Sequence, residues 1–206
     1  MGHPLLQTVL HYAVLLVVWW RVVLTAPVPD QSTACLDALS SVTGITATLH
    51  YDAELLLVDY ERIHEFKGES IPEYVPDATV SGATHAEKLY NVAVKELLFS
   101  WHLGVVEEDQ TNFWDLIDAS LLQKFVTAKS RLSNHSQTIK DLLKVVDPDF
   151  TTPTMPATPE LNNTHSYTKK LYGWAVLSNL KDLAANLIIE IDTMTKNGIC
   201  GEDVQN

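Results

Sequence analysis

The sequence contains little that could carry out chemistry. Cys35 and Cys200 are the only cysteines among 206 residues, and no Cys-x-x-Cys pair occurs. Two cysteines cannot form a disulfide scaffold, and the missing Cys-x-x-Cys pair argues against redox chemistry and against a structural zinc site. The fold must therefore be held together by a hydrophobic core.

Sequence motifs of enzymes are also missing. Gly-x-Ser-x-Gly, His-Glu-x-x-His and glycine-rich phosphate-binding loops do not occur. A di-iron carboxylate site in a helix bundle needs Glu-x-x-His on each of two helices, and only Glu61 and His64 have this spacing. We therefore expect no enzymatic activity, no metal and no other cofactor. A metal-dependent oxidase stays an alternative, which metal analysis of the pure protein would test.

Positive charge is scarce. The chain has 14 Lys and Arg against 26 Asp and Glu, which gives a formal net charge of −12. Phosphate backbones and anionic membrane surfaces repel such a chain, so we expect no nucleic acid as a partner. Proteins are the more plausible partners.

A long apolar run occurs only at the N-terminus. Residues 9–20 read VLHYAVLLVVWW, and Arg21 then interrupts a run that is shorter than the roughly 20 residues of a membrane-spanning helix. Small residues follow up to Ala26, as signal peptidase requires. The pattern predicts a signal peptide over residues 1–26 and a secreted, extracellular protein. A short signal anchor is the alternative.

The remaining residues, 27–206, have the pattern of a single helical domain. Apolar residues recur at steps of three and four, and no stretch shows sustained β-type alternation. We expect four long helices, at residues 36–66, 84–104, 114–146 and 165–197. Helices of this length are long for a globular protein, whose mean is about 11–12 residues. The sequence therefore predicts an all-α four-helix bundle.

The predicted connections between the helices are long, short and long. Residues 67–83 and 147–164 are rich in proline or glycine and can each span the length of a helix at about 3.3 Å per residue. Residues 105–112 are too few to do so. This order predicts the up-up-down-down topology of long-chain bundles.

That topology brings the two cysteines together. The start of the first helix and the end of the fourth lie at the same end of the bundle, so Cys35 and Cys200 become neighbours. An oxidising compartment would allow them to form a disulfide. Two free thiols on frayed chain ends are the alternative.

Two N-glycosylation sequons fit a secreted protein. They begin at Asn134 and at Asn162. Asn162 precedes the fourth predicted helix and is the better candidate, because Asn134 falls in the middle of the third helix beside core positions.

The start of the fourth helix resembles a known family. Residues 167–177 read YTKKLYGWAVL, and this segment resembles the leukaemia inhibitory factor, ciliary neurotrophic factor and cardiotrophin group of the interleukin-six family. Within the group the likeness is closest to ciliary neurotrophic factor, and residues 113–144 are similar as well. The family begins its last helix with Phe-x-x-Lys, which contacts a leukaemia-inhibitory-factor-type receptor. The resemblance implies that Tyr167 and Lys170 bind this receptor, with tyrosine in place of the family's phenylalanine.

The resemblance also implies a mechanism. Members of the family are secreted cytokines that bridge cell-surface receptors, and a second face recruits a shared signal-transducing receptor. We therefore expect a cytokine that is monomeric when unbound. The alternative is a secreted helical carrier that holds a small apolar ligand in its core. Without the resemblance, Tyr167 would be read as a staple between loop and helix and Lys170 as a solvated charge.

Overall fold

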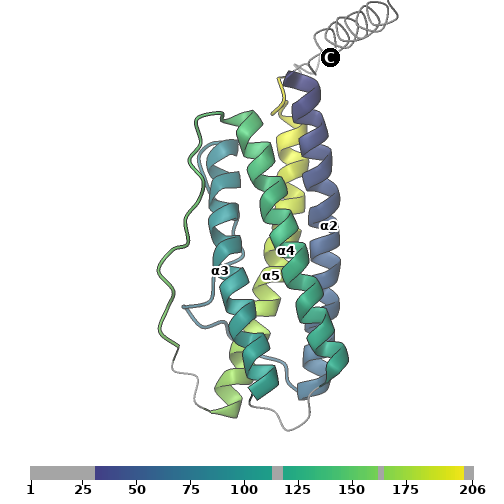
Figure 1. Cartoon of the computed structure of the whole chain (residues 1–206), viewed down its shortest axis with the longest axis vertical. Helices are drawn as coiled ribbons and strands as arrows, with labels where there is room; N and C mark the ends of the chain where they lie inside the picture. The colour runs from purple at the N-terminus through teal and green to yellow at the C-terminus, as the bar shows by residue number, and fades with distance from the viewer. Residues whose placement is uncertain (1–30, 113–117, 162–164, 202–206) are drawn as a thin grey trace, which may run out of the picture. The chain divides into compact units, whose positions relative to one another are not determined.

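The computed structural model describes residues 31–112, 118–161 and 165–201, and these residues contain four helices and no strand (Figure 1). The helices are α2 (Gln31–His64), α3 (His85–Asn112), α4 (Ala119–Val146) and α5 (Ser166–Lys196). They pack side by side as a bundle, which confirms the predicted all-α four-helix fold. None of these four helices is long and apolar enough to cross a membrane. The predicted signal peptide, residues 1–26, lies outside the described residues.

The predicted end of the second helix at Gly104 is wrong. α3 continues through Gly104 to Asn112, so residues 105–112 are not a connection. A glycine inside a helix costs about 1 kcal/mol relative to alanine. Beyond Gly104 the helix buries Val106 and Gln110, which are 1% and 5% exposed, and this burial offsets that cost.

α4 begins at Ala119, and its start is fixed by a cap. The Asp118 carboxylate accepts hydrogen bonds from the amides of Ser120 and Leu121, at 2.9 Å each. The predicted core positions Trp114 and Ile117 lie outside the described residues. The fourth helix matches its predicted range closely, because it runs from Ser166 to Lys196.

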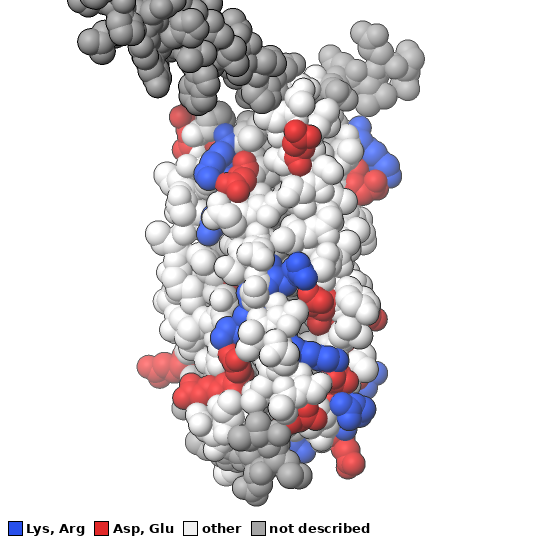
Figure 2. Space-filling view, turned by 45° about the vertical axis from the view of Figure 1, so that its right-hand side comes forward, with Lys and Arg blue, Asp and Glu red and all other residues white. Residues whose placement is uncertain are grey.

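Ion pairs record which helices are neighbours. Between α2 and α4, Asp59 pairs with Lys124 at 2.5 Å and Asp52 pairs with Arg131 at 3.0 Å. Between α3 and α5, Lys88 pairs with Glu190 at 2.7 Å and Asp109 pairs with Lys169. In both helix pairs the residue numbers rise along one helix as they fall along the other. On the face seen in Figure 2, acidic and basic side chains lie next to one another in small groups. Wide uncharged areas separate these groups.

The hydrophobic core has two parts. One is built around Leu56, Phe99, Phe125 and Leu177, and the other around Leu39, Leu89, Ile139 and Leu187. All eight side chains are at most 4% exposed. Each half draws residues from all four helices, so each half binds the whole bundle together.

A polar layer separates the two halves on three of the helices. Thr46 of α2, Glu96 of α3 and His135 of α4 are each at most 2% exposed. The Thr46 hydroxyl donates to the Val42 carbonyl at 2.6 Å and lies 2.7 Å from Nε2 of His135. Nδ1 of His135 contacts a carboxylate oxygen of Glu96. Buried polar groups are stable in such a core only when they satisfy one another.

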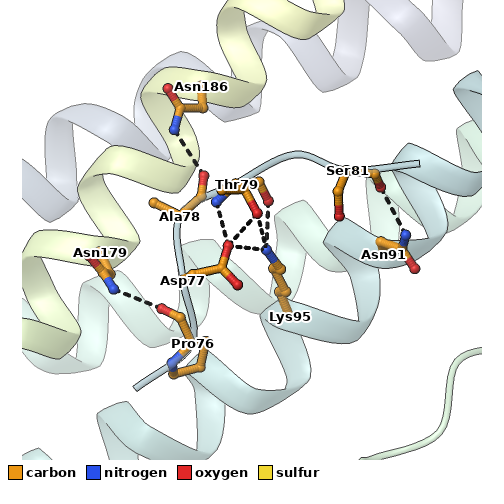
Figure 3. A network of polar contacts seen from close by, with 9 residues as sticks. All are labelled: Pro76, Asp77, Ala78, Thr79, Ser81, Asn91, Lys95, Asn179 and Asn186. Atoms are coloured by element: carbon orange, nitrogen blue, oxygen red, sulfur yellow. Dashed lines mark hydrogen bonds and ion pairs between the residues drawn. The ribbon is translucent and has the colours of Figure 1, made fainter. Parts of the chain in front are cut away.

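The connection from α2 to α3 contains a strap, residues 76–81, which lies along α3 and α5 (Figure 3). Four of its carbonyls accept hydrogen bonds from side chains of these helices. From α5, Asn179 donates to Pro76 and Asn186 donates to Ala78, both at 2.9 Å. From α3, Lys95 donates to Thr79 at 2.7 Å and Asn91 donates to Ser81 at 2.8 Å. The strap therefore has a fixed position without forming any regular secondary structure.

Asp77 provides a charged contact in the strap. Its carboxylate accepts from the Lys95 ammonium at 2.6 Å and from the Thr79 amide at 2.8 Å. Burial alone would raise the pKa of Asp77, but the bonds from Lys95 and Thr79 outweigh it and lower the pKa to about 2. The carboxylate therefore stays charged at neutral pH.

A disulfide joins the two ends of the bundle's chain. Cys35, in the first turns of α2, is bonded to Cys200, just beyond α5, with 5.5 Å between their Cα atoms. The predicted pairing is confirmed. Cys35 is 4% exposed, so the bond also caps the second half of the core.

The strap should loosen in acid. The folded pKa of Asp77 lies below its ordinary value of about 3.9, so its contribution is complete above about pH 4 and is lost as the pH falls towards 2. We expect the Thr79 amide to exchange hydrogen faster in Lys95→Met at neutral pH, and the difference from the parent to shrink near pH 2. Lys196→Met, which breaks an exposed pair with Asp192 inside α5, is the control. Equal exchange in the two variants would contradict this role of Lys95.

Reduction of the disulfide should destabilise the bundle without unfolding it. The bond closes a loop with a sequence separation of 165 residues, and disulfides typically contribute about 2–4 kcal/mol. Denaturant titrations with and without a reductant, followed by circular dichroism, measure the free energy of unfolding. We expect a fall of about this size with native helix content kept. An unchanged midpoint, with two thiols titrating in the untreated protein, would refute the bond.

Candidate functional site

The candidate site lies where the end of α2 meets the start of α5. Tyr167 is in the first turn of α5, and its side chain is 63% exposed. The hydroxyl of Thr168 accepts a hydrogen bond from the His165 amide at 3.3 Å and donates to the His165 carbonyl at 2.8 Å. The helix start is therefore ordered, and Tyr167 projects from a fixed backbone.

A second aromatic side chain stands beside Tyr167. The ring of Phe66 meets it edge to face, with 5.6 Å between the ring centroids and 81° between the planes. Phe66 lies two residues beyond the end of α2 and is half-buried. Sequence reasoning missed Phe66, since 101 positions separate the two residues. The predicted topology carried the signal, because it puts the end of the first helix beside the start of the fourth, just as it joins the cysteines at the other end.

The end of α2 aims Phe66 at Tyr167. Glu65 has a left-handed backbone with φ of 47°, and the Phe66 amide donates to the Glu61 carbonyl at 3.1 Å. This is the hydrogen bond of a Schellman helix end, in which the residue after the left-handed position turns back over the helix. The turn brings Phe66 out of the helix direction and over the start of α5.

Trp174 fixes the next residues of the connection. A Cβ atom on Gly68 would lie 2.3 Å from the ring of Trp174, so the indole packs directly on the Gly68 backbone. The indole Nε1 also donates to the Glu61 carboxylate at 2.9 Å. Phe66 is therefore held between an ordered helix end and a pinned glycine.

Lys170 binds the end of α2 rather than lying free in solvent. Its ammonium donates to the His64 carbonyl at 3.0 Å, and the side chain is half-buried. The last carbonyls of a helix have no partner within the helix, so a lysine at this position stabilises the helix end. The structure thus places Tyr167 and Lys170 on the same turn but in different surroundings: Tyr167 is exposed, and Lys170 bonds to the protein.

Helix α3 also contacts the site. Lys169 pairs with Asp109, and Nε2 of His64 lies 2.6 Å from the amide oxygen of Gln110. Burial lowers the pKa of His64, and the nearby charge of Lys170 lowers it further. The hydrogen bond to Gln110 raises the pKa, but by less than burial lowers it. His64 is therefore neutral at pH 7 and donates to Gln110. Asp109 and Gln110 belong to the part of α3 beyond Gly104 that the sequence pattern did not predict.

The spacing of Glu61 and His64 does not build a metal site. The Glu61 carboxylate accepts from Trp174, and the His64 ring bonds to Gln110. Within residues 31–112, 118–161 and 165–201, no three His, Cys, Asp or Glu side chains are grouped so that they could hold a metal ion.

The structure describes only one of the two asparagines that begin the predicted glycosylation sequons. Asn134 is exposed on α4, although it lies next to the buried His135. Asn162 lies outside the described residues.

No family model fits the chain, and no curated protein matches its sequence.

Gly173 should be essential to the packing beneath the site. A Cβ atom there would lie 2.2 Å from the hydroxyl oxygen of Tyr60, a side chain with no exposed surface that donates to the Lys170 carbonyl at 3.3 Å. We expect Gly173→Ala to lower the free energy of unfolding by about 1–3 kcal/mol, as overpacked core sites do. Denaturant titration measures it.

Gly104→Ala is the matched control, because a Cβ atom at this helical glycine meets nothing within 4 Å. We expect that variant to gain up to about 1 kcal/mol. A similar effect of the two substitutions would show that the contact between Gly173 and Tyr60 is not tight in solution.

Proposed function

We propose that this chain is a secreted long-chain cytokine that signals by bridging cell-surface receptors. The receptors are a leukaemia-inhibitory-factor-type receptor and the shared signal-transducing receptor of the interleukin-six family. The proposal rests on the sequence resemblance at the start of α5 and on the geometry of the site built there.

The bundle topology that the proposal requires is up-up-down-down. Three contacts support it. The disulfide joins the start of α2 to the end of α5, and the Lys88–Glu190 pair joins the start of α3 to the same end of α5. The Asp59–Lys124 pair joins the end of α2 to the start of α4. Helices α2 and α3 then run one way, and α4 and α5 run the other way. The long connections carry the chain back along the bundle between helices that run in the same direction.

The observation that carries the proposal is the exposure of Tyr167. An aromatic ring that is 63% exposed at the start of α5 occupies the position at which the family uses phenylalanine to bind a receptor. Its edge-to-face contact with Phe66 limits its motion, so binding would cost little side-chain entropy. Phe66 and Tyr167 together form what we name the aromatic pair. Aromatic residues of this kind dominate the binding energy of many interfaces.

Lys170 has a supporting role in this proposal. Because its ammonium holds the His64 carbonyl, it fixes the helix end from which Phe66 emerges. Lys170 also lies one helical turn from Tyr167. An acidic side chain of the receptor, at the rim of the interface, would pair with the charge of Lys170.

We place the second receptor face on α2. Tyr51, Leu55 and Val58 are 58%, 37% and 53% exposed, and their spacing of four and three residues puts them on one side of the helix. Apolar side chains grouped on the outer side of a bundle helix are typical of a surface that another protein covers.

Secretion is part of the proposal. The disulfide between Cys35 and Cys200 requires an oxidising compartment to form and persist. The predicted signal peptide over residues 1–26 and the sequons at Asn134 and Asn162 agree with that route.

The carrier alternative is less well supported. A carrier needs a cavity inside the bundle and few exposed aromatic side chains. Tyr60, Phe99, Phe125 and Tyr172 fill the first half of the core and have no exposed surface. The exposed aromatic residues Tyr51 and Tyr167 also favour a protein partner over an internal ligand.

Receptor binding should depend on the aromatic pair. We expect Tyr167→Ala and Phe66→Ala each to weaken binding to the ectodomain of a leukaemia-inhibitory-factor-type receptor by about 2 kcal/mol, or about 30-fold, with an unchanged melting temperature for Tyr167→Ala. Tyr167→Phe keeps the ring and should keep the affinity. Surface plasmon resonance with the purified protein measures this.

The control is Tyr51→Ala, which removes an equally exposed tyrosine from α2 and should leave this receptor's affinity unchanged. Lys170→Met should lower both affinity and melting temperature, since it releases the end of α2. If the parent protein does not bind, the receptor assignment fails and the carrier alternative must be tested next.

A further inference from the structure

The polar layer of the core opens toward a hollow between α3 and α4. The hollow has a volume of about 390 Å³. Leu97 and Leu132 provide apolar walls, and the small side chains of Ser100 and Ser133 leave the space between the helices unfilled. Glu96 and Ser136, which are 2% and 8% exposed, line it from the core side.

Two buried polar atoms of these lining residues have no hydrogen-bond partner among the residues that the structure describes. They are Oε2 of Glu96 and Oγ of Ser136. Leaving a buried polar atom without a partner costs about 1–3 kcal/mol, and more for a charged group. A molecule that bonds to both atoms from the hollow would remove this cost.

The hydrogen-bond pattern shows which chemistry is missing. Because the Thr46 hydroxyl donates its proton to the Val42 carbonyl, its oxygen accepts from Nε2 of His135. One proton then lies between Nδ1 of His135 and Oε1 of Glu96. Oε2 of Glu96 offers only lone pairs, so the missing partner is a hydrogen-bond donor.

The rest of the lining is mostly polar and can accept further hydrogen bonds. Ser100, Ser133, Asn134 and Gln137 also line the hollow, and each has a side-chain oxygen that can accept a hydrogen bond. The two leucine walls suit a methylene stem, and the chain's net charge of −12 favours a cation. A planar guanidinium on an aliphatic stem meets all three requirements, because it carries five N–H donors and no acceptor.

We propose that the hollow between α3 and α4 binds an arginine side chain supplied by a protein partner. The guanidinium donates to Oε2 of Glu96 and to Oγ of Ser136, and the stem lies between Leu97 and Leu132. Both buried atoms have almost no exposed surface, so this binding requires lining side chains such as Gln137 and Lys140 to move aside. Lys140 is itself a cation at the lining, so its charge acts against binding of a second cation there.

The test uses the full chain labelled with ¹⁵N and two probes, N-acetyl-arginine amide and the uncharged N-acetyl-citrulline amide. We expect saturable chemical-shift changes at Leu97, Ser133 and Ser136 with the arginine probe, and about tenfold weaker binding of citrulline. The ring nitrogens of His135 should shift as well, because the probe binds the carboxylate that shares its proton.

Variants at exposed positions distinguish the hollow from general charge attraction. Ser133→Leu fills the hollow without touching the buried pair and should weaken arginine binding about tenfold. Ser130→Leu, an exposed serine of α4 that does not line the hollow, should change nothing. Lys140→Gln should strengthen binding, because it removes a positive charge from the lining.

Two outcomes would overturn the proposal. Equal binding of arginine to Ser133→Leu and to the parent would show diffuse attraction to an acidic surface. The absence of any saturable shift with the parent would show that water alone fills the hollow. Neither outcome involves a receptor, the aromatic pair or Lys170, so the proposed function would stand or fall separately.

Discussion

A carboxylate and an imidazole in the middle of the apolar core set the register of the bundle. Glu96, His135 and Thr46 come from three helices and bond to one another with almost no exposed surface. If one helix slid by a turn, a buried Glu96 would face leucine, at a cost larger than that of any single apolar mismatch. Apolar side chains tolerate such sliding far better. The polar layer thereby makes one alignment of α2, α3 and α4 strongly preferred, and α5 packs against helices α2 and α3 that are already aligned.

At the end of the bundle that carries the aromatic pair, close contacts align α5 with α2. Tyr60 approaches Gly173 so closely that no side chain fits between them, and Trp174 lies on Gly68 in the same way. Close contacts of this kind form only when α2 and α5 have one particular alignment along the bundle axis. Lys170 and the left-handed Glu65 then direct Phe66 toward Tyr167. An exposed ring becomes a defined surface feature because the helices beneath it cannot shift.

The helices and the disulfide could be predicted from the sequence, because periodicity and connection length are local signals. The end of α3 could not, since the cost of Gly104 is visible in the sequence whereas the burial of Val106 and Gln110 arises only from packing. His135 was visible as the one polar residue in the apolar stripe of its helix, but its partners Thr46 and Glu96 lie 89 and 39 positions away. The strap was predicted only as a long link. Its fixed position depends on Lys95, Asn179 and Asn186, whose amides and ammonium look like ordinary surface groups in the sequence.

The disulfide has a mechanical consequence. Cys35 lies at the start of α2 and Cys200 just after α5, so the covalent bond connects the two points at which the chain enters and leaves the bundle. A force that pulls on residues before Cys35 and after Cys200 passes through the sulfur–sulfur bond and leaves the helices unstretched. With the bond intact the bundle keeps its shape under such load, and with the bond reduced the same force would peel α2 and α5 away from their neighbours.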